Sequence, residues 1–380
     1  MLKYLKPVLI LVVSCLMWGC GESNSLHEIE GDGMVNIVLS VATVDSESSG
    51  RSRADEYYFE EPSSQFERLR SLRYIFVRPD GTVEYNIYID TNIPESGVDY
   101  YNSVKFKVKG GEKKKIYVIG NEASVRDLYN FDNIKVGSMF PTSDVESIIL
   151  QSPSPASPLF DNTDETSAKY LPMAEQFEID VVRPSGNATT DTYQYETLFL
   201  TRTTIKFSIS AKVEPLSNSN IVLKRVTFNQ IGDRQFLFPH NTTYSPEKYP
   251  LSGDNRIITA YDIPTEVVNS SVSFDVNWIF PPMSVEGKIA SPPIYFPETK
   301  LVADDKYSVR VVVAIDGEDF EYEADLPNLP SLPRNTHVRL NLVFTGHNVE
   351  CHVDVAPYIG VELKPSFGFD KLHPNLPDNN

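Results

Sequence analysis

Cysteine is rare in this chain of 380 residues, and its three cysteines are unevenly placed. Cys15 and Cys20 lie together in an apolar segment near the start, and Cys351 stands alone in the body of the chain. This excludes a framework of internal disulfides, because Cys351 could pair only with a cysteine of the amino-terminal segment. Cys351 lies in the alternating segment 349–355, and we interpret it as a small thiol on the apolar face of a strand.

Basic residues are also few relative to acidic ones. The chain has 34 lysines and arginines against 52 aspartates and glutamates, which gives a formal net charge of -18. Such a surface repels a phosphate backbone, so the composition argues against nucleic acid as a partner. It also disfavours adsorption to anionic lipid headgroups.

Motifs of catalysis and metal binding are missing as well. The sequence has no Gly-x-Ser-x-Gly elbow, no phosphate-binding Gly-x-x-x-x-Gly-Lys-Ser/Thr loop and no His-Glu-x-x-His pair. Cys351 and His352 are neighbours on a strand and face opposite ways, which is wrong for a shared metal. For Asp161, Asp164 and Glu165 a solvated acidic loop is a better interpretation than a calcium site. We therefore predict a protein that is not an enzyme and uses no cofactor.

The chain lacks an apolar run of the roughly 20 residues that a membrane-spanning helix needs. Its amino-terminal apolar run, Pro7–Trp18, follows the basic residues Lys3 and Lys6 and is itself followed by the small residue Gly19. This layout is typical of a secretory signal peptide, which we assign to residues 1–19. A small residue followed by cysteine at the end of the leader resembles a bacterial lipoprotein signal. In that class the cysteine is lipidated and the chain is cut just before it.

Two cysteines are candidates for the lipid. Cys20, preceded by Gly19, leaves an apolar region of ordinary length. Cys15 follows residues 12–14, which fit the small-residue pattern slightly better, but it leaves only about eight apolar residues, at the short end of the range for such leaders. We predict lipidation at Cys20, with Cys15 as the alternative, and secretion without lipid stays open.

Aromatic residues, proline and short alternating segments are plentiful. The chain contains 20 tyrosines, 20 phenylalanines and 27 prolines, a composition that favours strands with frequent turns. Short helices are expected only at 124–130 and 142–149. Apolar alternation predicts strands at 34–44, at two runs within 69–89, and at 104–108, 115–119, 203–211, 222–231, 272–276, 307–315, 320–324, 337–344 and 349–355.

Turn signals and a weak repeat organise these strands. Pro79-Asp80-Gly81 and Asp316-Gly317-Glu318 are typical of hairpin turns, and Gly110-Gly111 is expected to join another strand pair. An alternating strand, a polar spacer and a second strand recur near residue 195, a repeat of about domain length. We predict an all-β chain with a tether at 20–33 and two tandem β-sandwich domains, 34–195 and 196–380.

The order of these parts is similar to that of the fimbrillins, pilus subunits of the Bacteroides and Porphyromonas group of bacteria. The resemblance covers nearly the whole chain in short segments. These are the lipoprotein leader, the strand 35–44, the acid- and serine-rich loop with Arg51 and Arg53, and segments 72–81, 117–121, 171–173, 200–206, 295–299 and 333–337. It implies transthyretin-like sandwiches, export as a lipoprotein to the cell outer membrane, and assembly with other fimbrial subunits.

The resemblance also implies strand exchange between subunits. In shaft subunits of this family a trypsin-like protease cuts after an arginine beyond the first strand, and Arg51 and Arg53 are the candidates here. The first strand then leaves, and the carboxy-terminal strand of a neighbouring subunit fills its groove. The expected groove-filling side chains are Val35, Ile37, Leu39 and Val41, and those of the donor strand are Val353, Val355, Tyr358, Ile359, Val361 and Leu363.

Two other interpretations stay open. An anchor or accessory subunit would keep both its lipid and its first strand and would stay attached to the membrane. Nothing in the sequence separates shaft, tip and anchor. A surface lipoprotein could instead bind glycan on a sandwich face, with residues 57–59, Tyr100, Tyr101 and Trp278 as a stacking platform.

Overall fold

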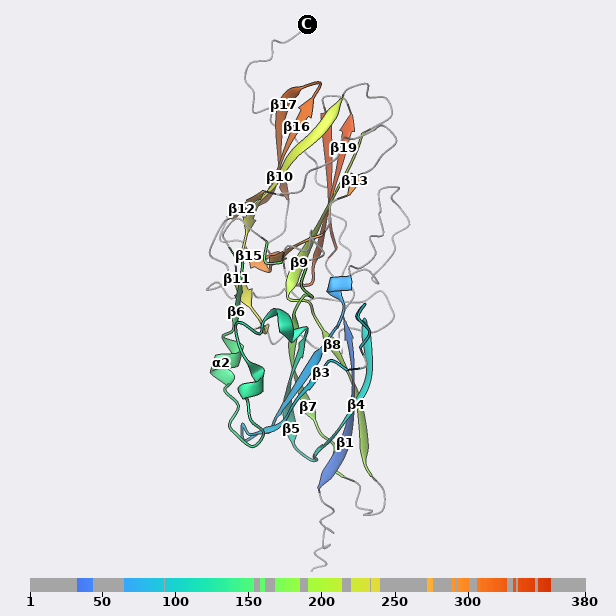
Figure 1. The fold of residues 1–380 in the computed structure, drawn as a ribbon, viewed down its shortest axis with the longest axis vertical. Helices are drawn as coiled ribbons and strands as arrows, with labels where there is room; N and C mark the ends of the chain where they lie inside the picture. Colours follow the sequence, from blue (N-terminus) through green and yellow to red (C-terminus); the bar gives the residue numbers. More distant parts are fainter. Residues whose placement is uncertain are drawn as a thin grey trace, which may run out of the picture.

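The computed structural model describes residues 33–43, 65–91, 93–153, 158–160, 168–184, 191–213, 220–232, 234–239, 272–275, 289–290, 293–300, 306–326, 331–332, 334–345 and 348–356. Strands dominate these ranges (Figure 1). Their helical elements are α2 (Thr142–Glu146) and the 3-10 helices η1 (Gln65–Glu67), η2 (Glu122–Ser124) and η3 (Phe131–Asn133). No helix in this part of the chain has the length and apolar character to cross a membrane. The predicted all-β class is confirmed, although a turn between two 3-10 helices replaces the helix expected at 124–130.

The amino-terminal half is a sandwich of two sheets (Figure 1). One sheet has the order β4-β1-β8, formed by β4 (Tyr100–Lys109), β1 (Met34–Thr43) and β8 (Tyr193–Leu200). The other has the order β3-β2-β5-β7, formed by β3 (Val83–Ile89), β2 (Leu72–Val77), β5 (Lys113–Gly120) and β7 (Met173–Asp180). An apolar core lies between them and includes Tyr74, Phe76 and Phe106.

The hairpin β2–β3 forms where its turn residues predict it. Gly81 has φ 83°, a conformation that favours glycine because it has no Cβ. The Gly81 amide donates to the Arg78 carbonyl at 2.9 Å, and the Arg78 amide donates to the Thr82 carbonyl at 2.9 Å. Asp316 and Gly317, with φ 53° and 92°, make the second predicted turn, between β16 (Tyr307–Ile315) and β17 (Glu318–Leu326).

The glycine pair Gly110-Gly111 does not join a hairpin, and this expectation is wrong. β4 pairs with β1, whereas β5 pairs with β2 and β7, so the glycines carry the chain from one sheet to the other. The physical reason is that both strands cover the same core. Phe106 and Val108 of β4 approach it from one sheet, and Ile116 and Val118 of β5 approach it from the other.

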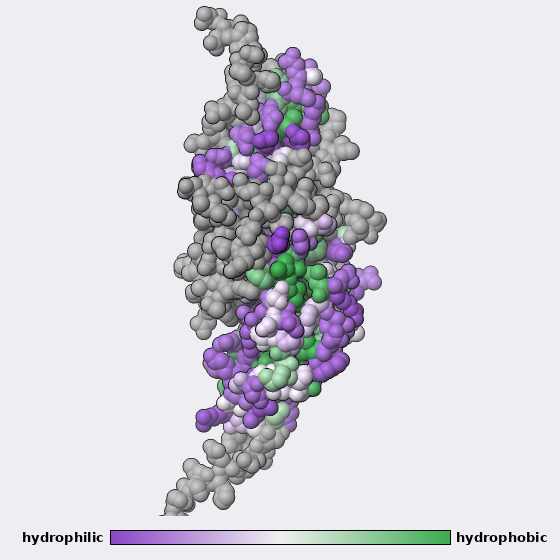
Figure 2. Space-filling model, turned by 90° about the vertical axis from the view of Figure 1, so that its left-hand side faces the viewer, coloured by the Kyte–Doolittle hydropathy of each residue, from purple (hydrophilic) through white to green (hydrophobic). Residues whose placement is uncertain are grey.

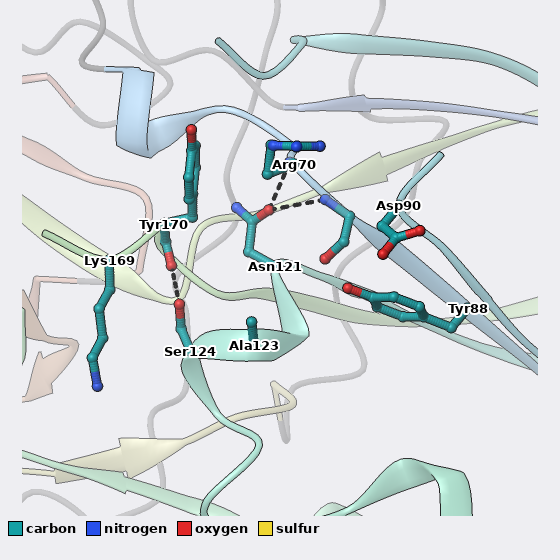
Figure 3. A pocket seen from close by; sticks show the side chains of 9 residues that line it. Arg70, Tyr88, Asp90, Asn121, Ala123, Ser124, Lys169 and Tyr170 are labelled. Atoms are coloured by element: carbon teal, nitrogen blue, oxygen red, sulfur yellow. Dashed lines mark hydrogen bonds between the residues drawn. The ribbon is translucent and has the colours of Figure 1, made fainter. Parts of the chain in front are cut away.

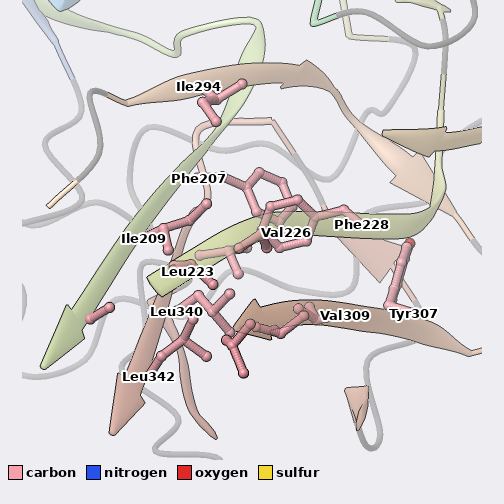
Figure 4. Close-up of a cluster of buried hydrophobic side chains, with 14 of the residues drawn as sticks. Phe207, Ile209, Leu223, Val226, Phe228, Ile294, Tyr307, Val309, Leu340 and Leu342 are labelled. Carbon is pink, nitrogen blue, oxygen red and sulfur yellow. The ribbon is translucent and has the colours of Figure 1, made fainter. Parts of the chain in front are cut away.

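The carboxy-terminal half is a second sandwich, so the predicted tandem arrangement is confirmed. Its sheets have the orders β13-β9-β19-β20, with β14 also beside β9, and β12-β10-β16-β17. Phe207, Phe228 and Leu340 lie in the core between them (Figure 4). The bounds are β9 (Thr204–Val213), β10 (Ile221–Ile231), β12 (Val272–Asp275), β13 (Ile289–Ala290), β14 (Ile294–Pro297), β16 (Tyr307–Ile315), β17 (Glu318–Leu326), β19 (His337–Thr345) and β20 (Asn348–Ala356).

The weak sequence repeat corresponds to a shared strand arrangement. β1 pairs antiparallel with β4 and parallel with β8, and β9 pairs antiparallel with β13 and β14 and parallel with β19. The first strand of each half therefore has one antiparallel and one parallel neighbour. The predicted domain boundary between residues 195 and 196 falls inside β8. The chain passes from one sandwich to the other between Leu200 and Thr204.

A third apolar core links the two halves. The segments around η3 and α2 pack on the second face of the β3-β2-β5-β7 sheet, where the rings of Tyr117 and Phe140 stack with centroids 4.4 Å apart. Leu237, Phe238 and Tyr295 from the carboxy-terminal half belong to the same core. β6 (Ile149–Gln151) also pairs with β11 (Arg234–Phe236) across the halves. Figure 2 views the molecule from the side on which α2, β6 and β11 lie in Figure 1. Hydrophobic residues lie there among hydrophilic ones.

Buried charges complete this junction. The Nζ of Lys206 in β9 lies 3.0 Å from Oε1 of Glu67 in η1, and the Tyr295 hydroxyl donates to the same oxygen at 2.6 Å. Burial on its own raises the pKa of Glu67, but the charges of Lys206 and Arg202 outweigh it and hold that pKa below its ordinary value. Arg334 and Glu298 form a second buried pair, with Nη2 and Oε1 2.6 Å apart.

Glu175 is a further buried carboxyl beside the junction. The Thr201 hydroxyl donates to it at 2.9 Å. Burial, the largest influence, raises the pKa of Glu175 from 4.5 to about 8, although Arg334 acts to lower it. Between pH 4.5 and 8 the folded chain therefore keeps a proton that the unfolded chain releases. This group makes the chain less stable as the pH rises through that window.

We predict that Glu175→Gln is more stable than the parent chain at pH 8, by about 2–5 kcal/mol in the free energy of unfolding, and nearly equal to it at pH 4. Urea denaturation at both pH values measures the difference. The control is Glu178→Gln on the same strand, whose exposed carboxyl should change stability by less than about 0.5 kcal/mol at either pH. A pH dependence unchanged in Glu175→Gln would contradict the assignment.

Candidate functional site

β1 occupies the middle of a three-stranded sheet and is paired on both edges. Its register is antiparallel to β4, with Ile37 opposite Phe106, and parallel to β8, with Ile37 opposite Gln194. Because both edges are paired, removal of β1 would leave unpaired backbone groups on β4 and on β8. The place of β1 between β4 and β8 is called the β1 seat below.

The inward face of β1 consists of the four side chains that the sequence nominates as groove fillers. They alternate along the strand, as the period of two requires, and each is fully buried in the amino-terminal core. These side chains are Val35, Ile37, Leu39 and Val41. The β1 seat is therefore an apolar groove between two sheets that is filled from within the same chain.

Sequence reasoning missed a contact on the outer face of this sheet. Lys105 of β4 reaches over β1, and its Nζ donates to the Tyr193 hydroxyl of β8 at 3.1 Å. The same nitrogen lies 4.9 Å from the centroid of the Tyr193 ring. Tyr195 lies nearly parallel to Tyr193, with ring centroids 6.4 Å apart. No sequence signal could find this contact, because residues 105 and 193 meet only through the strand order.

β20 contains the beginning of the predicted donor segment. It pairs antiparallel with β19, and the register places Val353 and Val355 opposite Leu340 and Val338. β20 stands at the end of its sheet, with no strand on its other edge within the described ranges. The other nominated donor residues lie outside the described residues; these are Tyr358, Ile359, Val361 and Leu363.

The residues nominated for lipidation and for proteolysis also lie outside the described residues. These are Cys15, Cys20, Arg51 and Arg53. The same holds for residues 57–59 and Trp278 of the glycan hypothesis. Of its remaining members, Tyr100 is exposed at the start of β4, whereas Tyr101 packs partly buried against the core. The described pair therefore does not form one platform.

A separate cavity of about 400 Å³ lies where β2 and β7 begin and where β3 and β5 end (Figure 3). Asn121, in the left-handed conformation with φ 59°, lines it. Its Oδ1 accepts from the Arg70 amide at 2.7 Å, and its Nδ2 donates to the Leu171 carbonyl at 2.8 Å. The Ser124 hydroxyl donates to the Tyr170 carbonyl. These polar groups serve to join loops. No cluster of three potential metal ligands occurs among the described residues.

Comparison with known proteins gives matches among solved structures only. No protein-family model matches the chain, and no curated protein matches it. The tip fimbrial protein Mfa3 of Porphyromonas gingivalis, with a carboxy-terminal truncation, is 10% identical with a TM-score of 0.48, covering 85% of this chain and 99% of its own.

Two further matches come from Parabacteroides distasonis. A protein described as a cell adhesion protein is 12% identical with a TM-score of 0.48, covering 87% of this chain and 99% of its own. A fimbrial assembly protein is 11% identical with a TM-score of 0.43, covering 84% and 95%. Fimbrial and cell-adhesion proteins are thus among the solved structures to which this chain is similar.

We predict that Leu39→Ala lowers the free energy of unfolding by about 2–5 kcal/mol, because it removes buried methyl groups and leaves a cavity in the core. Val38→Ala is the matched control. Val38 is the neighbouring residue on the half-buried outer face, and its truncation should cost about 1 kcal/mol or less. Chemical denaturation measures both variants. Equal losses would contradict the division of β1 into an inward and an outward face.

Proposed function

We propose that this chain is a non-catalytic structural subunit of cell-surface fimbriae that joins other fimbrial subunits by exchange of β-strands. The observation that carries the proposal is the position of β1. It is the first strand of the chain's sandwiches, it lies between two neighbours, and its inward face is wholly buried. The resemblance of the sequence to the fimbrillins supports the assignment of this arrangement to a pilus.

The energetics favour replacement of β1 over an empty seat. Burial of one large aliphatic side chain is worth roughly 1.5–3 kcal/mol, so the inward face of β1 contributes on the order of 6–12 kcal/mol. This is comparable with the whole stability of a typical domain, about 5–15 kcal/mol. A subunit without β1 would therefore bind a strand of similar alternation, whose backbone would also pair with β4 and β8.

Both ends of the chain carry the parts that such an exchange needs. β1 ends at Thr43 and η1 begins at Gln65, so a trypsin-like cut behind Arg51 or Arg53 falls between them. The donor is the segment 349–363 of a neighbouring subunit. Its first part is the edge strand β20, which pairs with β19 in this chain and would have to leave that strand to act as a donor. Cleavage would detach β1 together with everything before it, and the donor strand would then take its place.

In this scheme the lipid on Cys20 brings the exported chain to the outer membrane and holds it there until it is cut. The signal peptide at residues 1–19 directs export, and the acylated cysteine holds the chain in the cell outer membrane. After the cut the lipid stays with the β1 fragment, and the body of the subunit enters the fimbrium. A chain that the protease does not cut keeps both its lipid and β1, and it serves as a membrane-retained anchor or accessory subunit.

We predict that a trypsin-like protease cuts the purified, unlipidated chain behind Arg51 or Arg53 and that ordered oligomers follow. Mass spectrometry identifies the cut, and size-exclusion chromatography and electron microscopy follow assembly. The double substitution Arg51→Gln and Arg53→Gln should prevent both. A clean cut that yields no oligomers and no binding of a peptide of residues 349–363 would contradict the proposal.

We predict that Cys20→Ser moves the protein from the membrane fraction to the soluble fraction of the exporting cell, because the thiol is the site of acylation. Cys15→Ser is the matched control and should remain in the membrane fraction. Mass spectrometry of the native amino terminus should find an acylated Cys20. Membrane retention of Cys20→Ser, together with its loss in Cys15→Ser, would transfer the assignment to Cys15.

A further inference from the structure

A row of lysines borders the β1 seat on the outer side of the sheet. Along β4, exposed lysines alternate with apolar side chains that face the core. The register places Lys105, Lys107 and Lys109 opposite Val38, Asn36 and Met34 of β1, respectively. In a chain of net charge -18, three aligned cations beside one strand form a local positive surface.

β1 offers this lysine row no opposite charge. Its outward residues carry no carboxylate; they are Met34, Asn36, Val38, Ser40 and Ala42. Lys105 contacts a neutral hydroxyl on Tyr193 instead, and the Nζ of Lys109 lies 3.9 Å from an oxygen of Glu112 on the connection to β5. β1, which fills the seat in this chain, therefore provides no negative charge opposite the lysine row.

The donor segment has the complementary pattern in its sequence. Across 349–363, most odd-numbered positions are apolar, and they include Val353 and Val355. Because side chains alternate along a strand, a donor with these residues in the core turns its even-numbered residues outward, including Tyr358, which the sequence nominates for the groove. Three of those are acidic: Glu350, Asp354 and Glu362.

We propose that the lysine row of β4 selects the acidic outer face of a donor strand from a second copy of this chain. The inference rests on the proposed function, since it concerns the strand that replaces β1. Seating the donor would allow Lys105 to exchange the neutral Tyr193 hydroxyl for a carboxylate, which is the stronger acceptor of a hydrogen bond.

The effect expected of the row is on rate and selectivity. Exposed ion pairs contribute little to affinity, because water and salt screen them. Complementary surface charge instead accelerates association and rejects partners of the wrong sign. The net charge of this strongly acidic molecule repels an acidic strand, and the lysine row is a place where such a strand can approach.

The test uses the full chain cleaved behind Arg51 or Arg53 and two fluorescent peptides of residues 349–363. One has the natural sequence, and the other carries Glu350→Gln, Asp354→Asn and Glu362→Gln, which leave the apolar positions unchanged. At about 20 mM salt the natural peptide should enter the cleaved chain about 10-fold faster than the neutral peptide. Near 0.5 M salt the ratio should fall below about 2-fold, since the charges are screened.

Variants of the cleaved chain locate the effect. Lys105→Gln combined with Lys107→Gln should remove the difference between the peptides. Lys224→Gln combined with Lys306→Gln is the charge-matched control in the other sandwich and should keep it; both of these lysines are exposed. Urea denaturation of the uncleaved variants establishes that both fold as the parent does.

The outcomes separate the inference from the proposed function. Equal entry rates for the two peptides, or a difference that survives Lys105→Gln with Lys107→Gln, would overturn selection by the lysine row and leave strand exchange in place. Entry of neither peptide would overturn both. A soluble uronic-acid polymer serves as competitor. If it binds the uncleaved chain through Lys105 while the peptides enter at equal rates, the row is a glycan surface and the inference is wrong.

Discussion

The burial of one face of β1 is the interaction on which the amino-terminal sandwich depends. Val35, Ile37, Leu39 and Val41 fill the space between two sheets, and both edges of the strand are paired. Neither neighbour could replace this strand without changing its own pairing, because β4 and β8 lie on opposite sides of it. The sandwich therefore requires some strand at this place, whereas nothing in the geometry requires that the strand belong to the same chain.

The remainder of the structure is organised so that β1 is involved in one core only. Neither the core of the carboxy-terminal sandwich nor the core that joins the halves contains a residue of β1 within the described ranges. The joining core includes Tyr295, whose hydroxyl also binds the buried Glu67. Loss of β1 would open the first sandwich, while the contacts that attach it to the second sandwich remain. This separation makes an exchange compatible with a stable body.

Much of the fold follows from local patterns. The alternation at 34–44 predicts β1 and its inward face, and Pro79-Asp80-Gly81 and Asp316-Gly317-Glu318 predict hairpins, because a turn acts on the residues beside it. Pairings between distant segments were not predictable in this way. The chain crosses sheets at Gly110-Gly111, and β1 pairs in parallel with β8, since the shared core decides both. Periodicity carries no information on either choice.

The polar contacts, like the strand pairings, could not be predicted from the sequence. Lys105 and Tyr193 are an ordinary lysine and an ordinary tyrosine until the strand order brings them together over β1. Glu67 and Lys206 likewise become a buried pair only where the halves meet. The inward, apolar face of β1 was predictable, because it repeats with a period of two. The lysine row beside it was not, because its place depends on which strands become neighbours.

A structure of the assembled form, determined by electron cryo-microscopy on oligomers grown from the cleaved chain, would reveal which chain supplies the strand in the β1 seat. Density for a strand between β4 and β8 should continue into the carboxy-terminal segment of a neighbouring copy. A strand there that continues into residues 33–43 of the same chain, in an assembly held together by other surfaces, would contradict strand exchange.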